Sequence, residues 1–105
     1  MNSFLENEFN SKKCQQILKE LSDFEDARIS LSTLVSRLKF LYRELQDANS
    51  EWVQNFYDAW MDLEIINALQ LSNIEDGLNA TLSKESTDQI KNSIAILRNL
   101  IAEIV

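Results

Sequence analysis

Residues 31–45 read LSTLVSRLKFLYREL, and this stretch decides the fold class. Its leucines stand at positions 31, 34, 38, 41 and 45, in alternating steps of three and four residues. That spacing places them on one face of an α-helix, with Val35 and Tyr42 beside them. We therefore predict a helix from Ser30 to about Asp47. Phe40 points away from the leucine face, and so do the basic residues Arg37, Lys39 and Arg43.

A similar stripe precedes this stretch. Residues 12–22 place Cys14, Ile17, Leu18 and Leu21 on one face. Ser11 is a suitable N-cap for that helix. Phe9 is out of phase with the stripe, so we expect a break near Asn10 and Ser11. Before the break, the capping-box spacing of Ser3 and Glu6 predicts a short first turn.

Two further helices are expected after residue 50. The first follows Ser50 and reaches about Asp76, with Gly77 as a left-handed cap. Its buried face is formed by Trp52, Val53, Phe56, Trp60 and Leu63, and Ile74 and Leu78 continue it. The last helix starts at Ser83 or Ser86, since Ser86 and Gln89 have capping-box spacing. Its apolar stripe comprises Ile90, Ile94, Leu97, Ile101 and Ile104.

The composition supports helices with short connections. The chain of 105 residues contains no proline and a single glycine, so few residues can punctuate strands or tight turns. This length suits one domain. The expected fold is all-α, an antiparallel bundle of three to four helices that occupies residues 1–105 as a single domain.

Charge is distributed unevenly along the chain. The net charge is −7, and residues 1–50 are nearly neutral. Between residues 51 and 76 there are six carboxylates and no basic side chain. Such a field repels nucleic acid and anionic membranes, so neither is an expected partner. It attracts a basic protein surface, although acidic residues also serve solubility alone.

The residues on which most catalytic sites depend are missing. The chain has no histidine, one cysteine and one glycine, so the usual general base, zinc site and phosphate loop cannot be built. We expect no catalytic residue, no cofactor and no metal. Asp58 and Asp62, with Glu51 two turns earlier, share one helix side and are the only suggestion of a magnesium or calcium site. One helix face rarely supplies enough oxygen ligands, which favours a solvated polar face.

Binding of a protein partner is a more plausible role for this acidic helix side than binding of a metal ion. Tyr57 lies beside Asp58 in sequence and joins apolar area to a hydroxyl group, which suits an interface anchor. Phe40 is a second candidate for an exposed aromatic anchor. The residues predicted to bind the partner are Glu51, Asn55, Tyr57, Asp58, Asp62, Glu75 and Asp76.

Two polar residues fall on or beside the apolar face of the third predicted helix. Glu64 and Asn67 need partners if they are buried. Arg37 or Arg43 can pair with Glu64. Such a pair would fix the register of two helices, and the alternative is a polar group inside a recognition site.

The expected location is the cytoplasm. The first residues lack the basic and apolar regions of a secretory signal, and no apolar run approaches the ~20 residues that span a bilayer. Cys14 is the only cysteine, so no internal disulfide can form, which suits a reducing compartment.

Residues 60–68 read WMDLEIINA, preceded by Trp52 and Phe56 and followed by a short loop and a Ser-capped closing helix. Over residues 28–105 this pattern resembles small helical immunity proteins encoded beside bacterial polymorphic or contact-dependent toxins. The resemblance implies a cytoplasmic antidote that binds and blocks a cognate toxin domain, often a basic nuclease. The chain lacks the tyrosine pair of the colicin DNase immunity proteins, so no functional residue is transferred from that group.

The sequence thus leaves three hypotheses. The first is an inhibitory binding protein of the immunity type, which would cover a basic cleft with carboxylates from residues 51–76. The second is a structural or adaptor bundle that forms a homodimer through an apolar helix face. The third is an enzyme that uses carboxylates and a metal ion.

Overall fold

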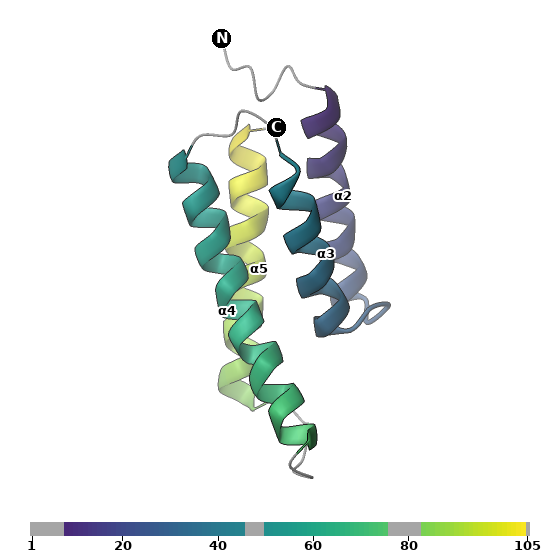
Figure 1. Ribbon diagram of the computed structural model, residues 1–105, viewed down its shortest axis with the longest axis vertical. Helices are drawn as coiled ribbons and strands as arrows, with labels where there is room; N and C mark the ends of the chain where they lie inside the picture. The colour runs from purple at the N-terminus through teal and green to yellow at the C-terminus, as the bar shows by residue number, and fades with distance from the viewer. Residues whose placement is uncertain (1–7, 46–49, 76–82, 105) are drawn as a thin grey trace.

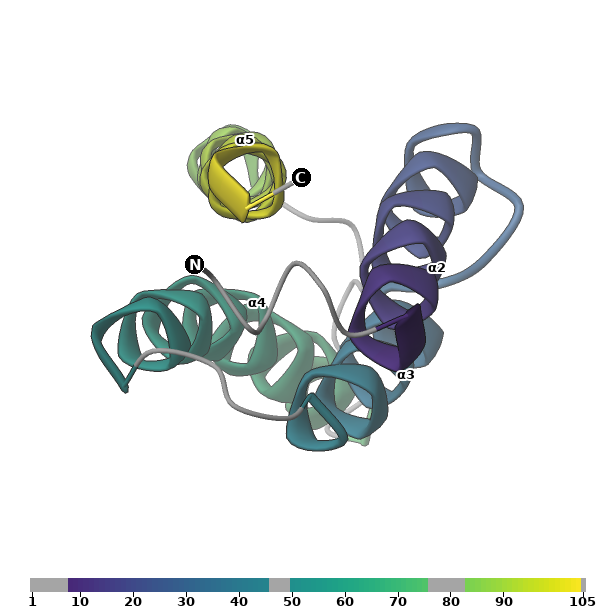
Figure 2. The same ribbon diagram turned by 90° about the horizontal axis from the view of Figure 1, so that it is seen from above.

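The computed structural model describes residues 8–45, 50–75 and 83–104, and the side chains of residues 10–45, 50–72 and 83–103. Four helices and no strand occur in these segments: α2 (Glu8–Glu25), α3 (Leu31–Arg43), α4 (Ser50–Glu75) and α5 (Lys84–Ile104). Successive helices run in opposite directions, so the predicted antiparallel all-α bundle is confirmed (Figure 1). In the view along the bundle, α4 lies between α3 and α5, and α2 packs beside α3 (Figure 2).

Helix α2 is longer than the sequence predicted. It already includes Glu8 and continues through Ser11 to Glu25, so the expected break near Asn10 and the Ser11 cap are wrong. The reason is that Asn10 is completely buried. Together with Cys14, Ile17 and Leu21 it continues the inward face, although its side chain is polar. The predicted first turn at Ser3 and Glu6 lies outside the described residues.

The end of α2 has the hydrogen bonds of a Schellman motif. The Arg28 N–H donates to the Asp23 carbonyl at 2.8 Å, and the Ala27 N–H donates to the Phe24 carbonyl at 3.0 Å. The motif requires a left-handed residue at C′, the first residue after the C-cap, where glycine is usual. Here Ala27 fills that position, with a φ of 61°. The turn that leads to α3 therefore contains Ala27 in a left-handed conformation, which its Cβ makes energetically unfavourable.

Helix α3 begins as predicted and ends earlier. The Ser30 side chain accepts a hydrogen bond from the Thr33 N–H at 3.1 Å, which confirms Ser30 as the N-cap. The helix stops at Arg43, with Glu44 as the C-cap, and the expected end at Asp47 lies outside the described residues. The leucine face is buried as predicted, at positions 31, 34, 38 and 41.

Two ion pairs join α2 to α3. Arg37 contacts Glu20 at 2.9 Å, and Lys13 contacts Glu44 at 2.7 Å. The Glu20 carboxylate is almost completely buried, whereas Arg37 is half exposed. Of the two arginines offered as partners for Glu64, Arg37 is therefore paired with Glu20 of the neighbouring helix instead.

Helix α4 is held to both neighbours by tryptophans. The Trp60 indole N–H donates to the Val35 carbonyl in α3 at 2.9 Å, and the Trp52 indole N–H donates to the Leu100 carbonyl in α5 at 2.8 Å. Phe56 lies between them and is completely buried. Trp52, Phe56, Trp60 and Leu63 are buried as predicted, Val53 is half-buried, and the side chain of Ile74 lies outside the described residues. The last described residue of α4 is Glu75, and the expected Gly77 cap, with Leu78, lies outside the described residues.

Helix α5 completes the core. The Ser83 hydroxyl accepts a hydrogen bond from the Ser86 N–H at 3.1 Å, so Ser83 is the N-cap and Ser86 lies inside the helix. Four residues of the predicted stripe are buried: Ile90, Ile94, Leu97 and Ile101. They close the hydrophobic core that also includes Ile17, Leu21, Leu34, Leu38, Phe56 and Leu63.

The helices differ markedly in length. Helix α4 has 26 residues and α3 has 13. At about 1.5 Å per residue these lengths correspond to about 39 Å and 20 Å. The second half of α4 and the start of α5 consequently extend past the ends of α2 and α3 (Figure 1). Ile65, Leu69 and Leu71 belong to the second half of α4 and are 52%, 59% and 46% exposed.

Candidate functional site

A shallow hollow lies on the seam between α4 and α5. It has a volume of about 310 Å³ and brings together residues from both helices. Asn55, Asp58 and Asp62 from α4 form its acidic side, and all three were predicted to bind a partner. Its lining is completed by Ala59 of α4 and by Ile96 and Leu100 of α5. We call these six residues the acidic groove.

Side-chain hydrogen bonds hold both carboxylates of the groove. The Gln54 amide donates to Asp58 at 2.8 Å, and the Gln89 amide of α5 donates to Asp62 at 3.2 Å. Both donors are neutral, so the hydrogen bonds orient the carboxylates without cancelling their charge. The groove lining contains no basic side chain. The nearby Arg98 of α5 is engaged on the other side, where it donates to Ser22 at 3.1 Å and pairs with Glu25.

The α5 side of the groove was missed by the sequence analysis. Ile96 is 38% exposed and lies off the buried stripe of α5. An isoleucine on the polar side of an amphipathic helix was the available signal, although single exposed apolar residues are common. Leu100 is buried, and its carbonyl accepts the Trp52 indole hydrogen bond. The groove therefore has an apolar wall opposite its carboxylates.

The other predicted site residues are placed differently. Glu51 is exposed in the first turn of α4 and does not line the hollow. Tyr57 lies on the α3 side, with its ring centroid 5.8 Å from that of Trp60. Burial, reinforced by the neighbouring Tyr57, raises the pKa of Tyr42 on α3, whereas Arg43 lowers it. Glu75 is the last residue of α4 and its side chain is not described, and Asp76 lies outside the described residues.

The two polar residues beside the core differ in burial. Asn67 is 7% exposed, whereas Glu64 is half-buried. In the described part of the chain, Glu64 forms no ion pair with Arg37 or Arg43. The predicted register-fixing pair is absent from these residues, and its structural role is taken by Glu20 and Arg37.

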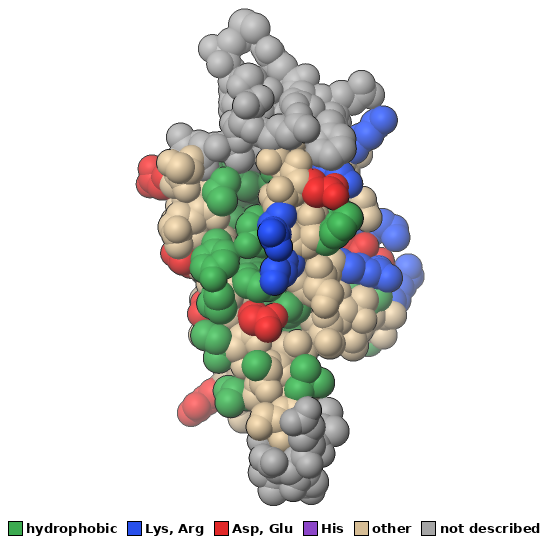
Figure 3. All heavy atoms as spheres, viewed as in Figure 1, with side chains coloured by type: hydrophobic (Ala, Val, Ile, Leu, Met, Phe, Trp, Pro, Cys, Tyr) green, Lys and Arg blue, Asp and Glu red, His purple; other side chains and the backbone are tan. Residues whose placement is uncertain are grey.

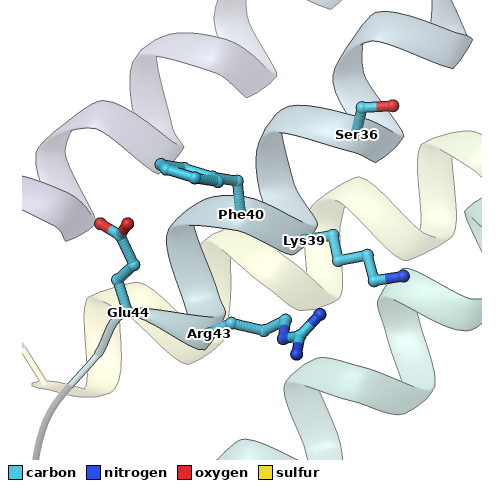
Figure 4. Close-up of a pocket in the computed structure, with 5 residues that line it drawn as sticks. All are labelled: Ser36, Lys39, Phe40, Arg43 and Glu44. Carbon is cyan, nitrogen blue, oxygen red and sulfur yellow. The ribbon is translucent and has the colours of Figure 1, made fainter.

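A second surface with a different character lies on the outer side of α3. A pocket of about 370 Å³ is lined by Ser36, Lys39, Phe40, Arg43 and Glu44. Lys39 and Arg43 extend to one side of the helix, toward α4, and Phe40 and Glu44 extend toward α2 (Figure 4). Phe40 is 64% exposed, as predicted. We call Lys39, Phe40 and Arg43 the basic ridge.

Lys39 and Arg43 remain without carboxylate partners in the described structure. The Lys39 ammonium lies 5.8 Å from the centroid of the Trp60 ring. Glu44, the one acidic residue of the pocket, is paired with Lys13 of α2. Basic side chains gather on the face over α3 and its border with α4, and acidic side chains lie along the outer edge of α4 (Figure 3). Most of the basic side chains on this face therefore lie over α3, where paired carboxylates such as Glu20 and Glu44 also lie.

The described residues contain no cluster of three or more His, Cys, Asp or Glu side chains that could hold a metal ion. Cys14 is buried in the core, and burial raises the pKa of its thiol from 9.0 to about 11. A neutral buried thiol is a poor nucleophile. What the acidic groove can do chemically is bind: it offers two oriented carboxylates beside an apolar wall.

Comparison with models of known protein families, with curated proteins and with solved structures finds no match for this chain. Among the described helices, none combines the length and the hydropathy that crossing a membrane requires.

Proposed function

We propose that this protein is an inhibitory binding protein of the immunity type, which acts in the cytoplasm by covering a basic surface of a cognate toxin domain. The observation that carries the proposal is the acidic groove. Asp58 and Asp62 share one hollow with exposed Ile96, and no basic side chain lines it.

The groove combines the two kinds of contact that protein interfaces use. Oriented carboxylates attract a basic partner and increase the association rate. Apolar area that becomes dry in the complex slows dissociation, because the strongest interface contacts are those that exclude water. Ile96, which is 38% exposed, supplies that area beside Asp58 and Asp62.

A rigid support also favours inhibition by direct coverage. Both walls of the groove are helices, and the Trp52 hydrogen bond to the Leu100 carbonyl ties them together at the groove. Surfaces that are ordered before binding lose less conformational entropy in the complex. The groove therefore needs no rearrangement to present its carboxylates to a basic cleft.

The test is a titration against the toxin domain encoded by the neighbouring gene, produced in an inactive form. Asp58→Lys with Asp62→Lys should weaken binding by at least about 100-fold, because like charges that face each other cost several kcal/mol and about 1.4 kcal/mol is tenfold. The fold should persist, since exposed charges contribute little to stability. Binding by the unmodified protein should also weaken between 0.1 M and 1 M salt, as screening shortens from about 10 Å to 3 Å.

The matched control is Glu64→Lys with Asp88→Lys. It makes the same change in net charge, but neither residue lines the groove. The control should bind nearly as well as the unmodified protein. Equal affinities for the two double variants would show that the groove is not the interface and would leave it a solvated polar surface.

A further inference from the structure

The charges of the basic ridge have no carboxylate partner in the described part of the chain, although the Lys39 ammonium lies over the Trp60 ring. Lys39 and Arg43 are four residues apart and extend to the same side of α3 (Figure 4). Like charges at this spacing repel and destabilise their helix. No carboxylate among the described residues neutralises either of them, although the chain has 17 acidic and 10 basic residues. The pair is thus open to carboxylates from another molecule.

The acidic groove has the matching arrangement. Asp58 and Asp62 are also four residues apart on one helix, so both charged pairs span a rise of about 6 Å. Two ion pairs can therefore form at once when α3 of one molecule lies along α4 of another. Because the two basic residues and the two aspartates have the same spacing, one register of α3 along α4 forms both ion pairs and is favoured over registers that form one.

The apolar residues match in the same register. Phe40 adjoins Lys39 in sequence and is 64% exposed. In the groove, Ile96 and Leu100 of α5 stand opposite the two aspartates. Phe40 extends from the other side of α3 than Lys39 and Arg43 (Figure 4), so a helix lying along the seam could place the basic side chains on α4 and the Phe40 ring on α5. An exposed aromatic ring beside an apolar hollow is a frequent interface anchor.

The two surfaces cannot meet within one chain. Trp60 ties one side of α4 to α3, whereas the groove lies on the seam with α5 (Figure 2). The body of α4 therefore separates the ridge from the groove, so each must find its complement on another molecule.

We propose that the acidic groove docks the basic ridge of a second copy of this chain, in a head-to-tail contact. Lys39 and Arg43 of one copy pair with Asp58 and Asp62 of the next, and Phe40 contacts Ile96 and Leu100. Because the two surfaces differ, each copy keeps one free ridge and one free groove. Such contacts grow into chains unless the geometry closes a ring.

This contact regulates the site on which the proposed function rests. A groove filled by a second copy cannot hold a toxin, so the toxin must displace the copy. The net charge of −7 opposes association at long range. At physiological ionic strength this repulsion is screened beyond about 8 Å, whereas ion pairs in contact persist. The self-association is consequently weak and concentration-dependent.

The experiment uses this protein alone, with sedimentation velocity over a series of concentrations. The ridge variant is Lys39→Glu with Arg43→Glu, and the groove variant is Asp58→Lys with Asp62→Lys. The unmodified protein should form species larger than a monomer that dissociate in 1 M salt, and each variant alone should remain monomeric. A mixture of the two variants should associate again, because the unchanged basic ridge of the groove variant fits the unchanged acidic groove of the ridge variant, and the two exchanged surfaces also attract each other. Both variants keep a net negative charge, so the overall charge cannot produce this rescue.

Two controls make the result specific. Arg28→Glu with Lys91→Glu changes the net charge as the ridge variant does, at exposed residues outside both surfaces, and should associate like the unmodified protein. Thermal melts should show that all variants are folded.

Three results would overturn the inference. In the first, the unmodified protein stays monomeric at every concentration, and an acidic segment of another protein becomes the occupant of the ridge. In the second, the mixture shows no rescue. In the third, both variants associate as the unmodified protein does, which assigns self-association to the exposed Ile65, Leu69 and Leu71. Toxin binding by a protein that stays monomeric would refute self-docking and leave the proposed function intact.

Discussion

The Trp60 indole N–H donates a hydrogen bond of 2.9 Å to the backbone carbonyl of Val35, one helix away. Trp60 also contacts the Tyr57 and Tyr42 rings, at centroid distances of 5.8 Å and 6.1 Å. Its side chain is 5% exposed. One residue therefore supplies apolar area, ring contacts and a hydrogen bond to the same border between α3 and α4.

Trp60→Ala should lower the free energy of unfolding by roughly 3–5 kcal/mol, the usual cost of deleting a large buried aromatic side chain. Trp60→Phe keeps much of the apolar area, and losing the hydrogen bond should add a cost of about 1 kcal/mol. Urea unfolding followed by circular dichroism measures both. An Ala variant as stable as the unmodified protein would mean that the buried face of α4 has been assigned backwards.

Arg37→Met should destabilise the protein by about 2 kcal/mol, because the buried Glu20 carboxylate loses its charged partner. Exposure of half of the Arg37 side chain keeps the cost below that of a fully buried pair. Lys19→Met is the control, since it removes an ion pair with Asp23 in which the lysine is 72% exposed. That change should cost less than about 1 kcal/mol. If denaturant titrations gave equal losses of stability for Arg37→Met and Lys19→Met, the buried Glu20 carboxylate would not depend on Arg37 more than an exposed carboxylate depends on its lysine.

Cys14 should resist thiol reagents in the folded protein. With its pKa raised from 9.0 to about 11, the thiolate fraction at pH 8 is about 100-fold lower than in the unfolded chain. Because the folded protein favours the neutral thiol, the contribution of Cys14 to the stability of the fold depends on pH. That contribution is fully present below pH 9, and it is lost as the pH rises through about 11. The measurement is labelling with a chromogenic disulfide, with and without denaturant. Rapid labelling without denaturant would contradict the burial of Cys14.

Ala27→Gly should raise the free energy of unfolding by about 0.5–1 kcal/mol, because glycine removes the Cβ strain at a φ of 61°. The gain is limited, since glycine also makes the unfolded chain more flexible. Ala95→Gly, at an exposed position inside α5, should instead cost about 1 kcal/mol. Opposite signs in parallel thermal melts are the expected result, and a loss of stability in both variants would contradict the left-handed turn.

Ile96→Asp should disrupt the apolar wall of the acidic groove with little effect on stability, because the side chain is 38% exposed. It should weaken toxin binding by at least about tenfold, since the dry apolar contact of the wall is lost and the new carboxylate is desolvated there without a basic group expected to face it. Asn99→Asp adds the same charge at an exposed position of α5 outside the groove and should bind normally. A normal affinity for Ile96→Asp would limit the interface to α4.

The sequence predicted the helices well where apolar residues repeat without interruption. The leucines of α3 and the isoleucines of α5 follow helical spacing, Ser30 is the predicted cap, and Ser83 is the cap among the two serines left open, Ser83 and Ser86. The prediction was wrong at the start of α2 because Asn10 is polar and yet completely buried. A pattern of apolar residues in the sequence does not reveal a core position that is occupied by a polar side chain such as Asn10.

The candidate site was only partly predictable for a different reason. Asn55, Asp58 and Asp62 share a helix side by spacing alone, so the sequence grouped them correctly. Ile96 and Leu100 join them only because α5 packs along that side of α4, and Glu20 meets Arg37 only because α2 packs beside α3. Helical periodicity assigns each residue to a face, but it does not determine which faces meet.

The extension of α4 and α5 past the ends of α2 and α3 has a consequence for local opening. Near Trp60, α4 is packed against two helices, whereas toward Glu75 it lies beyond α3 (Figure 1). Segments with fewer buried contacts open at lower free energy than the whole molecule unfolds. Amide hydrogen exchange should therefore be slowest around Phe56 and Trp60 and become progressively faster toward the end of α4. The acidic groove lies in the slowly exchanging half, so fraying of the extension would leave its two walls in register.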